Sequence, residues 1–436
     1  MTIEELHLLF LKSSGVCTDT RKIAKNNLFF ALSGENFDGN TFAQKAIENG
    51  AFRAIIDDSS KEFDGKTILV DDTLKTLQDL AIYHRKYLNL PIIALTGSNG
   101  KTTTKELINA VLSKKYKVTA TQGNLNNHIG VPLTLLSITT DTEIGIVEMG
   151  ANHIGEIDSL CKIATPDFGL ITNFGKAHLE GFGSEAGVVQ GKSELYKNIA
   201  STGGKLFVNI DDDKQVQLTE KIPHVTFGTK DNSDVVLHYP PASPFAEIIY
   251  KNEHFPSQLT GFYNATNMAA ALTIGLYFEV EVEDIQEAIT EYFPSNNRSQ
   301  IKKIQNLTLL LDAYNANPTS MVAALINFKG LQSTHKIAIL GDMFELGTSA
   351  AAEHLSIAEL ALSQKCDVIV FVGENFTKTN LEHENIYFFK DIPEMKNNFP
   401  ERIKDILKED TLILIKGSRG MALENIVPTL ETIVSK

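Results

Sequence analysis

Short apolar runs alternate with longer amphipathic stretches along most of this chain. From residue 91 onward, four apolar runs predict buried strands, at 92–96, 118–120, 144–149 and 168–172. The segments between them, such as 155–163, have helical periodicity, and a strong helix is predicted at 261–278. Strands that alternate with helices are typical of a parallel sheet with helices on both faces.

The same alternation occurs before and after this stretch. Strands are predicted at 27–32, 54–57 and 67–70 and helices at 41–49 and 73–88, and a plausible boundary follows at Asn89-Leu90-Pro91. A cluster of polar turn residues at 293–298 marks a second boundary, and strands are predicted again at 307–311, 337–340, 368–372, 386–389 and 412–415. We therefore expect an α/β protein of three domains, residues 1–88, 89–295 and 296–436.

Composition limits the function classes. The 436 residues carry a formal net charge of −14, which argues against a general surface for nucleic acid or anionic membranes. Cys17, Cys161 and Cys366 are far apart, odd in number and without metal-ligand spacing, so a reducing cytoplasm is expected. The first residues carry acids where a signal peptide needs bases, and no apolar run approaches the length of a membrane span.

The most informative segment is the run 95–104, LTGSNGKTTT. It lies between an apolar strand and the helical stretch 106–112, and a glycine-rich turn at a helix N-terminus presents free N–H groups to a polyphosphate. Lys101 can reach the β- and γ-phosphates, and the Thr102 hydroxyl can ligate Mg²⁺. The general P-loop pattern places its first glycine at 95, where leucine stands, and the glycine is at 97 instead. A structural strand-to-helix turn is the alternative.

Further polar residues follow predicted strands, and ligands bind at that edge of a doubly wound sheet. Glu148 can hold Mg²⁺ near the P-loop or bond to a neighbouring loop. His178 can be a metal ligand or a satisfied loop histidine. Lys192 lies in a helical stretch, and its context alone predicts a solvated helix face.

Clusters of neutral and charged polar residues follow strands in both the central and the last predicted units. The run 122–127 (QGNLNN) can line a cleft with amides or serve only as a turn. In the last unit, 312–318 (DAYNANP), 341–347 (GDMFELG) and 416–420 (KGSRG) each follow a strand. A nucleotide and a second substrate between two polar edges is a geometry suited to group transfer.

Together these segments resemble the Mur ligase family over nearly the whole chain. The motifs that carry the resemblance are 96–102 (TGSNGKT), 123–132 (GNLNNHIGVP), 148–151 (EMGA), 264–267 (NATN) with Ala269-Ala270, 312–318 (DAYNANP), 340–347 (LGDMFELG) and 416–419 (KGSR). The runs 314–318 and 341–347 resemble the branch that adds D-alanyl-D-alanine. The Asn-Pro-Arg type segment of the branch that adds meso-diaminopimelate or lysine is not found in the sequence.

The N-terminal unit resembles a domain that binds the UDP end of the acceptor. The resemblance implies substrate-binding roles here for Thr18, Asp19, Thr20, Arg21 and Asp38. Three positions depart from the family pattern: Thr20 stands where serine is frequent, Asn40 where histidine is common, and Tyr263 where histidine is usual.

The resemblance also assigns roles in the other two units. Lys101, Lys192, His178 and Arg298 would be catalytic, and Thr102, Glu148, His178 and Lys192 would hold metal, with Lys192 carbamylated by CO₂. The ATP site would comprise Gly97, Ser98, Asn99, Gly100, Lys101, Thr102, Thr103, Asn264 and Asn267 at the adenine, Arg298 at the phosphates and Asp312 at the ribose. The remaining substrate contacts would be Asn124, Asn126, Asn127, Asn315, Lys416, Ser418 and Arg419.

The implied activity is ATP-driven amide-bond formation between D-alanyl-D-alanine and UDP-N-acetylmuramoyl-tripeptide through an acyl phosphate, in the synthesis of cell-wall peptidoglycan. The implied cofactors are ATP, two Mg²⁺ ions and the carbamylated Lys192, and a monomer is expected. The third residue of the tripeptide stays open. Alternatives are another amino-acid ligase, such as a folylpolyglutamate synthetase, and a P-loop switch or transport ATPase.

Overall fold

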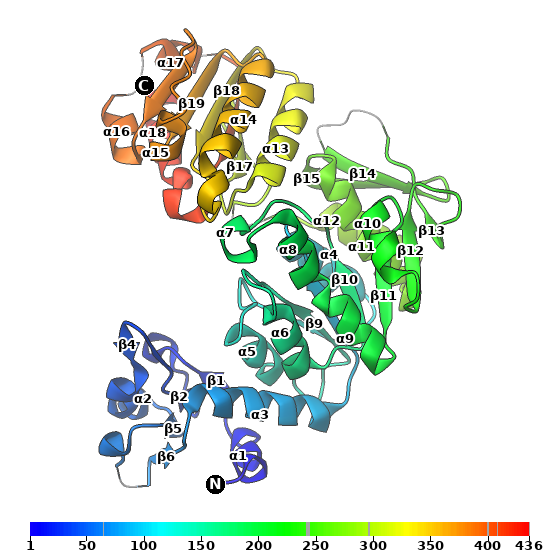
Figure 1. Cartoon of the computed structure of the whole chain (residues 1–436), viewed down its shortest axis with the longest axis vertical. Helices are drawn as coiled ribbons and strands as arrows, with labels where there is room; N and C mark the ends of the chain where they lie inside the picture. The colour runs from blue at the N-terminus through cyan, green and yellow to red at the C-terminus, as the bar shows by residue number, and fades with distance from the viewer. Residues whose placement is uncertain (64, 241–244, 295–296, 399–400, 408, 436) are drawn as a thin grey trace.

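The chain is organised around three main sheets, one in each third of the sequence. The computed structural model describes all residues except 64, 241–244, 295–296, 399–400, 408 and 436. In Figure 1 the N-terminal unit is blue, the central unit is cyan to green, and the C-terminal unit, yellow to red, lies at the opposite end of the molecule. Within the described residues, no helix combines the length and the apolar character needed to cross a membrane.

The N-terminal sheet has the strand order β1-β2-β5-β6, and its neighbouring strands pair in parallel. Its strands are β1 (Val16–Cys17), β2 (Leu28–Phe30), β5 (Arg53–Ile56) and β6 (Thr67–Leu69), and a separate two-stranded ribbon joins β3 (Ser33–Gly34) to β4 (Phe37–Asp38). Its helices are α1 (Ile3–Phe10), α2 (Ala43–Glu48) and α3 (Thr73–Leu88).

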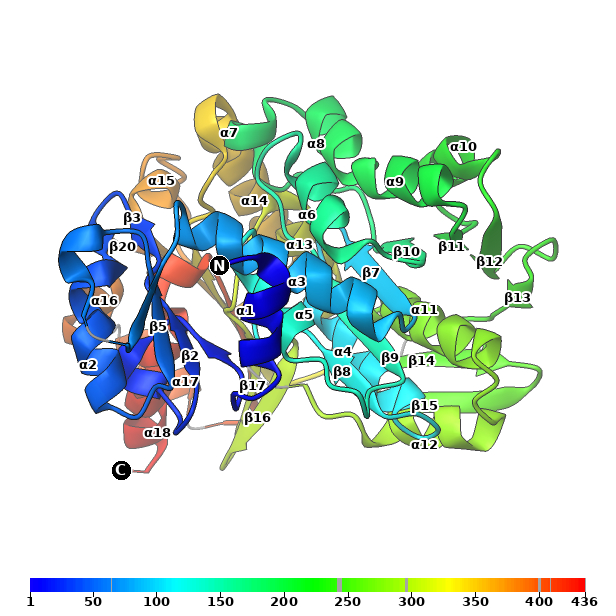
Figure 2. The same cartoon turned by 90° about the horizontal axis from the view of Figure 1, so that it is seen from below.

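Helix α3 connects this unit to the central one. Figure 2 shows α1 lying against α3, and α3 also packs on α5 and α6 of the central unit. Two buried histidines mark the junction: His7 Nε2 lies 3.0 Å from His84 Nδ1, and His84 Nε2 lies 2.8 Å from the carbonyl oxygen of Ile138. Burial lowers the pKa of both imidazoles.

The central sheet has the order β13-β12-β11-β10-β7-β9-β8, again with parallel pairs. Its strands are β7 (Ile92–Thr96), β8 (Val118–Ala120), β9 (Ile144–Glu148), β10 (Phe168–Ile171), β11 (Lys205–Asn209), β12 (His224–Gly228) and β13 (Val235–Val236). An antiparallel ribbon, β14 (Phe245–Tyr250) and β15 (Glu253–Thr260), follows.

Helices cover both faces of this sheet. They are α4 (Lys101–Leu112), α5 (Gly130–Leu136), α6 (Glu156–Ala164), α7 (Leu179–Phe182), α8 (Glu185–Lys192), α9 (Glu194–Thr202), α10 (Asp213–Thr219), α11 (Tyr263–Tyr277) and α12 (Val282–Glu291). Because strand side chains alternate, Ile93 and Leu95 of β7 pack with α4 and α11, whereas Ile92 and Ala94 join the core formed with α5, α6 and α9.

The C-terminal sheet has the order β16-β17-β21-β18-β19-β20. Its strands are β16 (Gln300–Ile304), β17 (Leu307–Asp312), β18 (His335–Gly341), β19 (Val368–Val372), β20 (Ile386–Phe389) and β21 (Thr411–Lys416), and only the β16–β17 pair in this sheet of the described chain is antiparallel. Its helices are α13 (Pro318–Gly330), α14 (Ala350–Ser363), α15 (Glu374–Thr377), α16 (Ile392–Asn397), α17 (Glu401–Ile406) and α18 (Val427–Val434).

The predicted α/β class with parallel sheets is confirmed, and several strand bounds agree to the residue, such as β7, β8 and β19. Two predictions differ. The stretch 41–49 is helical only from Ala43, because Gly39–Phe42 forms a 3₁₀ turn capped by Asp38. Strand β16 was not predicted, since this edge strand has the short sequence QIKKI, with two adjacent lysines and no apolar run. The second domain boundary, at 295–296, lies outside the described residues, and both boundaries stay predictions.

Candidate active site

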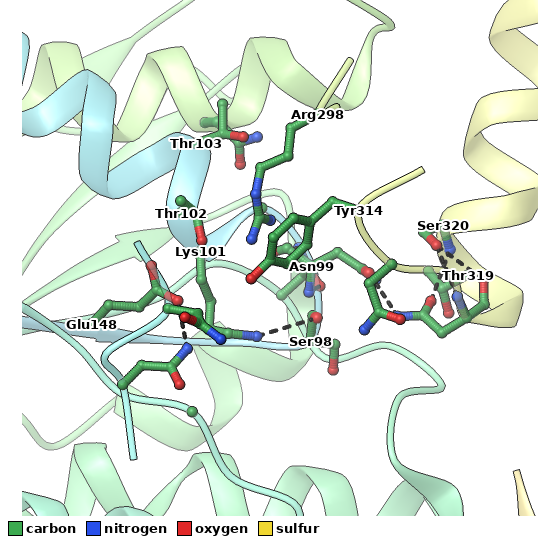
Figure 3. A pocket seen from close by; sticks show the side chains of 18 of the residues that line it. Ser98, Asn99, Lys101, Thr102, Thr103, Glu148, Arg298, Tyr314, Thr319 and Ser320 are labelled. Atoms are coloured by element: carbon green, nitrogen blue, oxygen red, sulfur yellow. Dashed lines mark hydrogen bonds between the residues drawn. The ribbon is translucent and has the colours of Figure 1, made fainter. Parts of the chain in front are cut away.

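A cavity of about 490 Å³ lies where the carboxyl ends of the central strands face the C-terminal unit (Figure 3). It brings together many of the predicted site residues, from segments far apart in the sequence. These are Ser98, Asn99, Gly100, Lys101, Thr102, Thr103, Asn124, Asn126, Asn127, Glu148, His178, Asn264, Asn267, Arg298, Asp312, Asn315 and Lys416.

The P-loop turn forms one wall of the cavity. Gly97 has φ +146° and Gly100 has φ +79°, and a Cβ at these positions would lie 2.0 Å from Thr172 Oγ1 and 2.6 Å from Asn267 Oδ1. The glycine at 97, displaced from the general P-loop pattern, is thus required by its close approach to β10. Helix α4 begins at Lys101, so the N–H groups of its first turn face the cavity end of the helix.

Lys101 bonds to backbone carbonyl groups of its own loop. Its Nζ donates to Gly97 O at 2.6 Å and Ser98 O at 3.4 Å. Burial lowers the pKa of Lys101, Glu148 acts in the opposite direction, and the guanidinium of Arg298 lowers it further. These side chains gather around one point in Figure 3, which is the arrangement expected for neutralising phosphate charge.

Glu148 ends strand β9 with its carboxylate buried at 1 % exposure. Its Oε1 accepts a hydrogen bond from Asn126 Nδ2 at 2.7 Å, whereas its Oε2 is buried with no partner. An unpaired buried carboxylate oxygen is costly, and beside Thr102 it fits a Mg²⁺ ligand. Within the described residues no three His, Cys, Asp or Glu side chains form a metal cage, so a Mg²⁺ here would take other ligands from phosphate and water.

Lys192 is not on a solvated helix face, which its sequence context alone predicted. It is fully buried at the end of α8, where Nζ donates to Ala151 O at 2.9 Å and lies 5.1 Å from the centroid of the Phe182 ring. Burial lowers the pKa of Lys192 well below its ordinary value, and the charge of Lys101 adds to this effect. A fully buried lysine with a lowered pKa fits the predicted reaction with CO₂.

His178 lines the cavity from the turn after β10, in a left-handed conformation with φ +53°. Its Nδ1 bonds Oε2 of Glu345, a residue of the C-terminal unit, and this contact holds the pKa of the Glu345 carboxyl below its ordinary value. Among the described residues, the ring of His178 is hydrogen-bonded through Nδ1, and Nε2 is the second ring nitrogen of this cavity-lining residue.

The C-terminal unit supplies a charged network. Lys416, at 2 % exposure, places Nζ 2.5 Å from Asp312 Oδ2, and Asp312 Oδ1 accepts from Ser299 N at 3.2 Å. The guanidinium of Arg298 lies 3.5 Å from the centroid of the Tyr314 ring, so both side chains approach the P-loop from the opposite wall (Figure 3). Sequence reasoning gave Asp312 and Lys416 separate roles without detecting that they pair.

Two asparagines of α11 fix the far side of the P-loop. Thr104 Oγ1 donates to Asn267 Oδ1 at 3.0 Å, and Asn267 Nδ2 donates to Asn264 Oδ1 at 2.8 Å. Tyr263, which stands where the family usually has histidine, bonds its hydroxyl to Ser299 Oγ at 2.8 Å. This tyrosine therefore ties the central unit to the segment that carries Arg298.

Other predicted residues do not line this cavity. Gly97 and Lys192 lie behind it; Ser418 Oγ accepts from Phe344 N at 2.9 Å, and Arg419 pairs with Glu424 at 2.7 Å. The N-terminal set, Thr18, Asp19, Thr20, Arg21 and Asp38, belongs to the N-terminal unit.

Within that set, Arg21 makes two bonds of 2.9 Å to Asp19, which lower the pKa of Asp19 to about 2. Asp38 accepts from Asn40, and Asn40 Nδ2 also donates to Asp57 Oδ1 at 2.7 Å. Asn40, at a position where histidine is common, is thus buried in a structural network.

Several lining residues were given no site role from the sequence. They are Asn152, Glu156, Asn173, Tyr263, Ser299, Tyr314, Asn317, Thr319 and Ser320. Tyr314 and Asn317 stand in the motif 312–318, which was a usable signal, and Asn317 Nδ2 donates to Asn99 Oδ1 at 2.7 Å across the two units. The others follow strands or helix starts without a distinctive pattern.

Comparison with known proteins agrees with this architecture. Residues 12–85 match the Mur ligase family, catalytic domain, 95–275 the Mur ligase middle domain, and 297–419 the Mur ligase, glutamate ligase domain. The chain belongs to the Mur ligase family, and not to the P-loop switches or transport ATPases considered above.

Similar proteins cover almost the full length. The UDP-N-acetylmuramoyl-tripeptide–D-alanyl-D-alanine ligase of Bacillus subtilis is 36% identical over 431 residues, 95% of this chain and 93% of the relative. A crystal structure of MurF from Acinetobacter baumannii has a TM-score of 0.85 at 31% identity and covers 96% of this chain and 93% of its own. The MurF ligase of Thermotoga maritima, solved in complex with ADP, has a TM-score of 0.82 at 26% identity, with 98% and 99% covered.

Proposed function

We propose that this protein joins D-alanyl-D-alanine to UDP-N-acetylmuramoyl-tripeptide with ATP, a step of peptidoglycan synthesis. The observation that carries the proposal is full-length similarity to D-alanyl-D-alanine-adding ligases, combined with a P-loop cavity closed by a second polar sheet edge. ADP in the Thermotoga maritima relative supports ATP as the nucleotide. The reaction forms an amide bond, and the conversion of ATP to ADP and phosphate drives it.

In the first step a carboxylate oxygen of the tripeptide attacks the γ-phosphorus, the bond to the β-phosphate oxygen breaks, and ADP leaves. The resulting acyl phosphate is then attacked by the dipeptide amine, the C–O bond to phosphate breaks, and a proton leaves the nitrogen. Lys101 and the N–H groups of the P-loop and α4 bind the phosphates, and Arg298 neutralises charge from the opposite wall.

Glu148, Thr102 and His178 are the residues that would hold Mg²⁺, with Lys192 as a carbamate behind them. When bound, Mg²⁺ withdraws charge from the phosphoryl oxygens. The partnerless Oε2 of Glu148 supports the first ligand, and the burial and lowered pKa of Lys192 support the carbamate. Asn264 and Asn267 would bind at the adenine, Asp312 at the ribose, and Asn315, Lys416, Ser418 and Arg419 near the dipeptide.

The three predicted domains would divide the work. Residues 1–88 would hold the UDP end of the acceptor through Thr18, Asp19, Thr20, Arg21 and Asp38, residues 89–295 would hold ATP, and residues 296–436 would complete the dipeptide site, while Asn124, Asn126 and Asn127 face the acceptor. We expect a cytoplasmic monomer, since the cavity is built within one chain and Cys17, Cys161 and Cys366 are free thiols.

A crossed-substrate assay tests this function. ADP release is measured with UDP-N-acetylmuramoyl-tripeptides, carrying lysine or meso-diaminopimelate, each combined with D-alanyl-D-alanine or with single amino acids. The proposal predicts ADP release only when an acceptor and the dipeptide are both present, and one amide product per ADP. Release of ADP without amide product, or equal release with a single amino acid, would contradict it.

A further inference from the structure

The loop of residues 341–347, between β18 and α14, brings Glu345 across to His178 of the central unit. Oε2 of Glu345 bonds His178 Nδ1, and the backbone N–H of Glu180 donates to Glu345 O at 3.1 Å. His178 lines the P-loop cavity, whereas Glu345 does not. The carboxylate therefore contacts a residue of the cavity wall without lining the cavity itself.

The loop that carries Glu345 is fixed from three sides. Asp342 accepts hydrogen bonds from the backbone N–H groups of Asn375 at 2.9 Å and Phe376 at 3.0 Å. The N–H of Met343 donates to His354 Nε2 at 3.0 Å, and the N–H of Phe344 donates to Ser418 Oγ at 2.9 Å. Every residue before Glu345 in this loop is thus bound to the body of the C-terminal unit.

Both partners adopt left-handed backbone conformations, with φ +60° at Glu345 and +53° at His178. Residues with a Cβ rarely adopt this conformation, and where they do the surrounding structure holds them in it. The fixed loop and the two constrained backbones together aim one carboxylate at one ring nitrogen.

Stability does not explain the contact. The Glu345 side chain is 50 % exposed and that of His178 21 %, and ion pairs in such surroundings contribute little to stability. The same interface contains a more buried contact, Lys176 Nζ to Glu353 Oε1 at 2.6 Å, where Glu353 is 16 % exposed. A simple latch between the units would depend more on Glu353.

From this geometry we infer that Glu345 is a positioning residue for the reaction proposed above. A carboxylate only accepts hydrogen bonds, so it fixes the proton of the neutral imidazole on Nδ1 and leaves the lone pair of Nε2 directed to the cavity. A carboxylate that accepts from one ring nitrogen of a histidine also fixes the orientation of the ring. The C-terminal unit thereby sets the tautomer of a residue in the nucleotide site.

The test compares Glu345→Ala with Glu353→Gln, which weakens the same interface without touching His178. The protein is labelled with ¹⁵N-histidine, and the His178 ring is assigned by the loss of its signals in His178→Gln. At alkaline pH, without nucleotide, the wild type and Glu353→Gln should show a protonated Nδ1 and an unprotonated Nε2, whereas Glu345→Ala should show exchange between the two tautomers. An unchanged His178 ring in Glu345→Ala would overturn the inference.

Kinetics give the second readout. Glu345→Ala should lower kcat by about 10–100-fold, the range for a lost carboxylate behind a ligating histidine, with a smaller change in KM for ATP. Glu345→Asp, which keeps the carboxylate, should recover part of kcat. A loss in Glu353→Gln that equals or exceeds the loss in Glu345→Ala would reduce Glu345 to a domain latch and refute the inference. The proposed function is judged separately, by the crossed-substrate assay on the wild type, which does not depend on Glu345.

Discussion

The partnerless carboxylate oxygen of Glu148 leads to a prediction with opposite effects on stability and ligand binding. Glu148→Gln keeps the size of the side chain, and its amide oxygen still accepts from Asn126 Nδ2. The substitution replaces the carboxylate, whose Oε2 is buried without a hydrogen-bond partner, by a neutral amide. An unsatisfied buried group costs about 1–3 kcal/mol and more when charged, so exchanging the charge for a neutral amide should stabilise the ligand-free protein by about 1–2 kcal/mol.

The magnitude can be measured by calorimetry. For a unit of about 200 residues, 1 kcal/mol moves the midpoint by about 2–4 °C, so the transition of the central unit should rise by about 2–8 °C. Mg-ATP at about 100 times its Kd stabilises by about 2.7 kcal/mol, and a tenfold weaker complex loses about 1.4 kcal/mol of this. Glu148→Gln should therefore start higher than the wild type and gain less from Mg-ATP.

Glu220→Gln, an exposed acid at the end of α10, is the matched control and should behave as the wild type in both conditions. If Glu148→Gln has a lower Tm than the wild type without ligand, the buried carboxylate does not destabilise the protein. If it keeps the full Mg-ATP shift, Glu148 does not hold Mg²⁺. Either result refutes the reasoning about this residue.

Three further predictions follow from buried groups. Lys101→Ala should lose both its turnover and the increase in Tm that Mg-ATP causes. Loss of the hydrogen bonds to the loop carbonyls should lower the free energy of unfolding by about 1 kcal/mol. A variant that still ligates at the wild-type rate would exclude a P-loop role for Lys101. Lys192→Arg should be inactive because guanidinium stays cationic and does not form a carbamate, and bicarbonate should reactivate CO₂-depleted wild type but not the variant. Burial lowers the pKa of His7 and His84, so these rings take up protons in the unfolded chain at about pH 6.5, before they do so in the folded protein. The free energy of unfolding should therefore decrease as the pH falls below about 6.5, by up to about 1.4 kcal/mol per pH unit for each ring. Urea unfolding from pH 8 to pH 5 measures this slope, and a slope unchanged in a His7→Gln, His84→Gln double variant would contradict it.

Buried parallel strands were the most predictable part of the fold. The run 368–372 is apolar throughout and the run 92–96 is apolar up to Thr96, because both faces of their sheets are covered by helices. The P-loop was predictable for the same reason, since strand, glycine turn and helix are contiguous in the sequence. Edge strand β16 lacks such a signal because solvent faces its charged side chains.

Contacts between distant segments were not predictable. Glu345 and His178 are 167 positions apart, and Lys416 and Asp312 are 104 apart. Each of these residues could be placed at a strand end, but which of them meet depends on strand order and on how the two units face each other. The burial of Lys192 had no local signal either, because the side chains that cover it, such as Phe182, lie on a different helix.

The most direct test of the central claim follows one oxygen atom. The terminal carboxylate of UDP-N-acetylmuramoyl-tripeptide is labelled with ¹⁸O at both positions and incubated with the enzyme, Mg-ATP and D-alanyl-D-alanine. If the reaction passes through an acyl phosphate, one ¹⁸O will be found in the released phosphate and the other in the carbonyl of the new amide bond. One phosphate should be released for each pentapeptide product formed. Phosphate without ¹⁸O, or phosphate released with no amide formed, would contradict the account.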